Sequence, residues 1–283
     1  MATKTKHTAL ISAQELHAQI DAHVIIDASW HMPATKRNPR AEYASEHIPG
    51  AMFFDIEGCC DTASGLPHML PAAEQFASAM SHIGVSADSA VVVYDATGIF
   101  SAPRLWWMLR VFGHRHVRVL DGGLPAWKAL YPTHSSANFV GNGRFIPNFV
   151  ASLVASRAQM LAWHHEASHQ ICDARSAARF SGAEAEPRAG MRSGHIPESS
   201  NLHYARLLTA EGMLKPPELL HKEFKDAGVI LGKPIVTSCG SGITACILAL
   251  ALHELGYDDV PVYDGSWAEW GAEANAGICA VAR

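Results

Sequence analysis

The sequence has no excess of basic residues: 22 lysines and arginines stand against 27 aspartates and glutamates, a formal net charge of −5. Proteins that bind nucleic acid in general are usually basic, so we expect no nucleic-acid partner. No apolar run approaches the ~18–20 residues that span a bilayer. The first residues also lack the apolar stretch of a secretory signal. We therefore expect a cytoplasmic protein with no membrane partner.

Cysteines are few as well. Six in 283 residues do not form a disulfide framework, which is typical of short secreted chains. We interpret them as free thiols in a reducing compartment. Hydrophobic residues, by contrast, make up 48% of the chain, which is sufficient for the core of one large domain or two ordinary ones.

The two halves of the chain repeat one another. Corresponding residues lie 143 to 148 positions apart: Asp27 and Asp173, His47 and His195, Asp95 and Cys239, Asp121 and Asp264, Trp127 and Trp270. A near-constant spacing along the whole chain indicates a duplicated domain. A stretch rich in Pro, Gly, Ser and Asn separates the copies. We predict an N-terminal domain over residues 1–135, a linker over 136–150 and a C-terminal domain over 151–283.

Each half alternates short β-branched runs with segments of helical periodicity. This alternation predicts an α/β fold in which each domain has a mainly parallel sheet flanked by helices. Sites in such sheets form at the carboxyl ends of strands. The segment "VTSCGSGITA" (236–245) lies at such an end, and Asp95 takes the place of its cysteine in the first half.

The loop that begins at Cys239 must turn sharply from strand to helix. Gly240 and Gly242 permit positive φ angles and leave backbone N–H groups unobstructed. Several N–H donors at a helix N-terminus form a nest that stabilises an anion. We expect this nest to favour an exposed thiolate. The alternative is a buried, inert cysteine before an ordinary helix cap.

The loop "CGSGITA" resembles the active loop of the 3-mercaptopyruvate sulfurtransferases, a tandem-domain branch of the rhodanese superfamily. "HIPG" after the first strand and "DGGLPAW" near the end of the first domain extend the resemblance over nearly the whole chain. Related thiosulfate sulfurtransferases carry basic residues in this loop, and this chain has none there. The resemblance implies two rhodanese-like domains, of which only the C-terminal one carries the nucleophile.

The resemblance also implies roles for individual residues. Cys239 takes up sulfur as a persulfide, and the loop residues Gly240, Gly242, Ile243 and Thr244 surround it. Arg179 and Arg188, nine residues apart, match two arginines that anchor the substrate. Ser241 matches a loop serine that works with a histidine and an acid from the first domain, here His68 and Glu57. In some members the acid is Asp. An alternative for each residue is an ordinary loop or surface position.

The implied reaction moves sulfur from 3-mercaptopyruvate through Cys239 to thioredoxin, a small thiol or cyanide, and releases pyruvate. It requires no metal and no organic cofactor. The alternatives are a thiosulfate:cyanide sulfurtransferase, a non-catalytic sulfur-carrier module, and a phosphatase, which would need an arginine in the loop. The sequence leaves open the physiological acceptor, the pathway, the oligomeric state, the degree of thiosulfate activity and any redox role of Cys59 and Cys60.

Two further motifs match other functions. "HEASH" (165–169) has the zinc-protease pattern, but counting back along the repeat places it in a connector after a helix that ends near Trp163, so we expect no metal there. "GSGITA" (240–245) matches a dinucleotide fingerprint, but too few residues follow it for a dinucleotide-binding domain.

Overall fold

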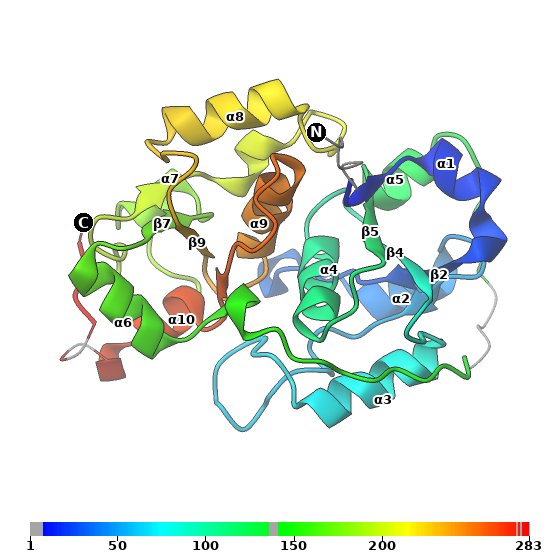
Figure 1. The fold of residues 1–283 in the computed structure, drawn as a ribbon, viewed down its shortest axis with the longest axis horizontal. Coiled ribbons are helices and arrows are strands. Elements are labelled where there is room, and N and C mark those ends of the chain that lie inside the picture. The colour runs from blue at the N-terminus through cyan, green and yellow to red at the C-terminus, as the bar shows by residue number, and fades with distance from the viewer. Residues whose placement is uncertain (1–7, 136–140, 276, 278, 283) are drawn as a thin grey trace, which may run out of the picture.

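The chain folds into two domains of the same design (Figure 1), and the computed structural model describes residues 8–135, 141–275, 277 and 279–282. Each domain has a five-stranded sheet in which all the pairs between strands are parallel. This confirms the predicted α/β class with two tandem domains. Among the described residues, no helix has the length and hydropathy to cross a membrane.

The first sheet has the order β1-β5-β4-β2-β3. Its strands are β1 (Leu10–Ile11), β2 (His23–Asp27), β3 (Met52–Phe53), β4 (Ala90–Tyr94) and β5 (Val117–Leu120). Its helices are α1 (Ala13–Ala18), α2 (Pro39–Ser45), α3 (Ala73–Ile83), α4 (Ala102–Val111) and α5 (Gly123–Lys128), with 3-10 turns η1 (Ile20–Ala22) and η2 (Pro33–Thr35). The central strand β4 is buried along its last four residues, as its β-branched run predicts for a sheet covered on both faces.

The second sheet repeats this order as β6-β10-β9-β7-β8. Its strands are β6 (Val154–Ala155), β7 (Gln170–Asp173), β8 (Ser200–Asn201), β9 (Ile235–Ser238) and β10 (Val262–Tyr263). Its helices are α6 (Arg157–Glu166), α7 (Ala177–Phe180), α8 (Pro217–Asp226), α9 (Ala245–Glu254) and α10 (Ser266–Trp270), with 3-10 turns η3 (Ala151–Leu153), η4 (Tyr204–Leu207) and η5 (Glu273–Asn275).

The two domains meet through helices α4 and α9, which lie between the two sheets (Figure 1). Every residue of α4 is buried, as are the first eight of α9. Residues of both helices belong to one continuous apolar cluster. Because each helix starts directly after a site loop, packing α4 against α9 brings the carboxyl ends of β4 and β9 to the same interface.

The second half of the predicted linker runs along the first domain near α3 (Figure 1). The N–H of Gly143 donates to the carbonyl of Ser81 at 2.9 Å, and Phe145 is buried. Residues 136–140 of that linker lie outside the described residues. The described part is therefore packed onto the first domain.

Candidate active site

The Cys239 loop is held by the last α-helix of its own domain, α10. The N–H of Trp267 donates to the carbonyl of Cys239 and that of Ala268 to the carbonyl of Gly240, both at 2.9 Å. The Ser266 hydroxyl accepts the N–H of Cys239 at 3.2 Å. The turn that opens α10 thus fixes the backbone on both sides of the cysteine.

The Cys239 sulfur accepts one backbone N–H of its own loop, whereas the loop sequence predicts several such donors. The N–H of Gly242 donates to it at 3.1 Å. Gly242 has a φ of +79°, a conformation that favours glycine. The expectation of an exposed sulfur is wrong, because Cys239 is only 2% exposed. Arg179 lies over the loop and the first domain closes the other side, so little of the residue reaches solvent.

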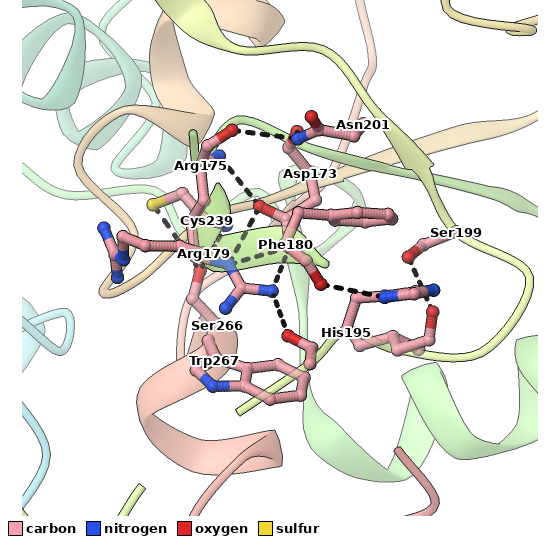
Figure 2. A network of polar contacts seen from close by, with 12 residues as sticks. Asp173, Arg175, Arg179, Phe180, His195, Ser199, Asn201, Cys239, Ser266 and Trp267 are labelled. Carbon is pink, nitrogen blue, oxygen red and sulfur yellow. Dashed lines mark hydrogen bonds and ion pairs between the residues drawn. The ribbon is translucent and has the colours of Figure 1, made fainter. Parts of the chain in front are cut away.

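Arg179 lies beside Cys239 (Figure 2) and against Gly240, the residue after the cysteine. A Cβ atom at Gly240 would lie 2.9 Å from Nη2 of Arg179, so this glycine leaves room for the guanidinium. Glu186 holds the same guanidinium, with Oε2 at 2.5 Å from Nη2. Glu186 also binds Arg175 at 2.7 Å, and Arg175 pairs with Asp173 at the end of β7. The family pattern points to Arg179, but the sequence carries no signal for the buried residues that support it.

Arg188 is half-buried, and its charged neighbours include Cys239, Arg179 and Glu186. Burial lowers the pKa of Arg188, while a charge on Cys239 opposes that effect and Arg179 adds to it. Two guanidinium groups near one sulfur attract an anionic substrate and give planar donors for carboxylate and carbonyl oxygens.

The first domain brings His68 to the Cys239 loop. Nδ1 of His68 lies 3.0 Å from Oγ of Ser241, although 173 positions separate the two residues. Nε2 of His68 lies 3.8 Å from Oε1 of Glu57. The Glu57 side chain is 63% exposed, and the indole N–H of Trp30 donates to it at 2.9 Å. The three predicted residues are therefore adjacent, with a long contact to the acid.

His68 is buried, and burial is the main cause that lowers its pKa to about 4, with Arg104 and Arg188 adding to the effect. The imidazole is thus neutral near pH 7. Nδ1 of His68 also lies 3.4 Å from the carbonyl oxygen of Ser241. In the tautomer with the proton on Nε2, toward Glu57, Nδ1 accepts the Ser241 hydroxyl proton. This orientation suits a proton acceptor.

The loop of the first domain shows how the same backbone surrounds a carboxylate. The Asp95 carboxylate accepts the N–H groups of Phe100, Ser101 and Ala102 at 2.8–2.9 Å. It also accepts the N–H and hydroxyl of Thr97. The backbone of the strand-to-helix loop therefore forms an anion nest in this domain, with a carboxylate where the second domain has a sulfur.

The structure shows where the two other motifs lie. Helix α6 ends at Glu166, three residues later than predicted, and Ala167 is left-handed with φ 51°. His165 is therefore in the last helical turn, whereas His169 lies beyond it and stacks on Trp163 at 3.9 Å. The pair does not share one helix face. "GSGITA" is the Cys239 loop itself.

Two copies of one α/β domain, with a cysteine loop at the interface between them, define a tandem-domain protein in which only the second copy has the cysteine in this loop. The chain belongs to the rhodanese family, because the rhodanese-like domain matches residues 12–130 and again 156–273.

Relatives and solved structures of similar length support this assignment. The chain is 46% identical over 253 residues to 3-mercaptopyruvate sulfurtransferase from Escherichia coli K12, covering 89% of this chain and 90% of the relative. It is 44% identical over 293 residues to thiosulfate/3-mercaptopyruvate sulfurtransferase 1, mitochondrial, from Arabidopsis thaliana, covering 95% and 77%. The crystal structure of SseA from Escherichia coli superposes with a TM-score of 0.84 at 43% identity, covering 93% of this chain and all of that one.

Proposed function

We propose that this protein transfers sulfur from 3-mercaptopyruvate, through a persulfide on Cys239, to thioredoxin, a small thiol or cyanide, and releases pyruvate. The observation that carries the proposal is a sulfur that accepts the N–H of Gly242 at 3.1 Å in a loop without cations. Arg179 and Arg188 stand beside that loop.

The donor is held by its oxygens. The guanidinium groups of Arg179 and Arg188 bind the carboxylate and the ketone of 3-mercaptopyruvate, which directs its sulfur to Cys239. The Cys239 thiolate attacks that sulfur and forms an S–S bond. The C–S bond breaks, and its electron pair leaves with the organic part as the enolate of pyruvate. The arginines stabilise the charge that develops on the enolate oxygen.

The proton steps fall to the residues from both domains. The donor's thiol proton passes to the Ser241 hydroxyl, whose own proton goes to Nδ1 of His68 at 3.0 Å. The imidazolium of His68 then gives that proton to the enolate carbon, which forms pyruvate and restores the neutral imidazole. The persulfide stays in the nest, where its outer sulfur takes the place that the Asp95 carboxylate oxygen has in the first domain. A nucleophilic acceptor removes that sulfur and restores the Cys239 thiolate.

The test of the proposed nucleophile is a direct chemical one. With 3-mercaptopyruvate alone, wild-type protein should release one pyruvate per site and gain the mass of one sulfur on the Cys239 peptide. The peptide that carries Cys60, a partly exposed thiol, is the internal control and should gain none. Cys239→Ser should form no pyruvate; undiminished pyruvate in this variant would eliminate Cys239 as the nucleophile and leave a carrier module as the alternative.

The donor preference separates the two sulfurtransferase alternatives. Thiosulfate is a compact dianion that gains from cations within the loop itself, in addition to the two arginines beside it, and Gly240 and Ser241 supply none. We expect kcat/KM for 3-mercaptopyruvate to exceed that for thiosulfate at least about tenfold. Equal values would favour the thiosulfate:cyanide alternative.

Arg188→Ala should mainly raise KM for 3-mercaptopyruvate, and an unchanged KM would remove the anchoring role of Arg188.

A further inference from the structure

A fully buried arginine of the first domain forms an ion pair with the second domain. Arg104 lies in the first turn of α4 and is 0% exposed. Its Nη2 lies 2.7 Å from Oδ1 of Asp264, a residue between β10 and α10. Its guanidinium also stacks over the ring of Trp107 at 4.5 Å. A buried charge is retained only where its partners are well placed, since removal of one partner leaves an uncompensated charge.

This pair touches both segments that meet at the cysteine. Nη1 of Arg104 donates to the carbonyl of Gly242 at 3.3 Å, and Nη2 donates to the carbonyl of His68. Oδ2 of Asp264 accepts the N–H of Leu70 at 2.8 Å. One ion pair therefore binds the backbone of the nucleophile loop and, at two points, the backbone around His68.

The two segments bound by the ion pair, at His68 and at Gly242, both have left-handed backbone conformations. His68 has a φ of +61°, which costs a non-glycine residue about 1 kcal/mol or more unless its surroundings impose it. Gly242 has no side chain in the way: a Cβ there would lie 2.8 Å from Nη1 of Arg104. The same Gly242 residue gives its carbonyl to Arg104 and its N–H to the Cys239 sulfur.

We propose that Arg104 and Asp264 are a positioning pair that sets the Gly242 N–H against the Cys239 sulfur and the His68 ring against Ser241. Neither residue contacts the substrate in this arrangement, because Arg179 and Arg188 bind the donor. The pair couples the two domains, so that the sulfur nest and the proton acceptor are in place together. This proposal rests on the proposed function for its kinetic part.

The experiment compares Arg104→Lys with Arg110→Lys. Arg110 is a matched control because it lies on the same helix, stacks on Trp106 at 4.7 Å and donates to a carbonyl of the second domain, that of Asp258, at 2.7 Å. Lysine keeps the charge in both variants but loses the planar fork. We expect kcat with 3-mercaptopyruvate to fall about tenfold to a hundredfold in Arg104→Lys, with KM changed by less than about threefold. Arg110→Lys should match wild type in both constants.

A second readout needs no donor. The rate at which iodoacetamide alkylates Cys239, followed on its peptide as a function of pH, reports how well the nest holds the thiolate. Loss of the Gly242 contact should move the midpoint up by about one pH unit in Arg104→Lys, and leave it in place in Arg110→Lys. If Arg104→Lys does not fold, Asp264→Asn makes the same test, because it keeps the side-chain shape and an acceptor for Leu70.

The outcomes separate the two proposals. The positioning role would be overturned if Arg104→Lys and Arg110→Lys had the same alkylation midpoint and the same kcat. This holds even if the wild-type enzyme is active. A wild-type protein that releases no pyruvate would overturn the proposed donor. In that case a shifted alkylation midpoint would still support the positioning pair.

Discussion

At the scale of single residues, the site depends on two glycines for different reasons. Gly242 is needed for its left-handed backbone and for the approach of Arg104, whereas Gly240 has no unusual φ. What Gly240 provides is space: a Cβ there would meet Nη2 of Arg179 at 2.9 Å. A residue with a side chain is therefore allowed by the backbone at position 240 but excluded by the arginine.

Gly240→Ala should lower kcat/KM for 3-mercaptopyruvate about tenfold, mostly through KM, because the new methyl group displaces Arg179 from its place over the loop and loses about one charge-assisted hydrogen bond to the donor. Steady-state kinetics measures the effect, and the mass of the Cys239 peptide after single turnover shows whether the persulfide still forms. Unchanged kinetics would mean that Arg179 does not bind the donor from this position.

At the scale of elements, the strand-to-helix loops after β4 and β9 have the same backbone design. In each, an N–H from the second helix after the loop donates to a loop carbonyl at 2.9 Å, from Leu124 of α5 to Asp95 and from Trp267 of α10 to Cys239. Each loop also has a left-handed glycine three residues later, Gly98 and Gly242. The first loop is saturated by its own carboxylate, so it has no room for a substrate anion. The loop at Cys239 holds no carboxylate, and the N–H of Gly242 donates to the sulfur instead.

Asp95→Asn should destabilise the first domain by about 2–3 kcal/mol, because an amide nitrogen in place of one carboxylate oxygen faces N–H donors and leaves at least one buried group without a partner. Asp88→Asn, at an exposed aspartate of the same domain, is the control and should change the free energy of unfolding by less than about 0.5 kcal/mol. Urea unfolding measures both. If Asp95→Asn were as stable as wild type, the Asp95 carboxylate would not be what holds this loop.

The same elements show which features the sequence could predict. The repeat spacing placed both sheets, and the glycines around Cys239 indicated the nest, because these signals are local or periodic. The end of α6 was misplaced by three residues, since Ala167 adopts a left-handed cap that is uncommon for alanine. The helix ends at Ala167, a residue whose type does not indicate a helix end.

At the scale of the whole molecule, most of what completes the site comes from contacts between domains. His68 meets Ser241 across 173 positions, and Arg104 meets Gly242 across 138. The resemblance supplied His68 and Ser241. The sequence does not indicate the pair of Arg104 and Asp264, although Asp264 repeats Asp121. A buried arginine in an apolar helix has no sequence pattern from which its partner can be predicted. Pairings of this kind depend on how the domains pack, which local sequence does not encode.

The interface also links the stability of the folded chain to pH through His68. Burial lowers the pKa of His68 to about 4 from a usual value near 6.5. Between these values the unfolded chain binds a proton that the folded chain does not. The contribution of neutral His68 is therefore fully present above pH 6.5 and is lost as the pH falls toward 4.

We expect wild-type protein to lose about 2 kcal/mol more of its free energy of unfolding between pH 7 and pH 5 than His68→Asn does. Asparagine tolerates the left-handed φ of +61° at this position but does not titrate, so the comparison isolates the imidazole. Asp27, whose pKa burial raises to about 6, has the opposite pH dependence and is present in both proteins, so it cancels. Urea unfolding at both pH values measures the difference; parallel losses would mean that His68 takes up its proton in the folded chain as readily as in the unfolded one.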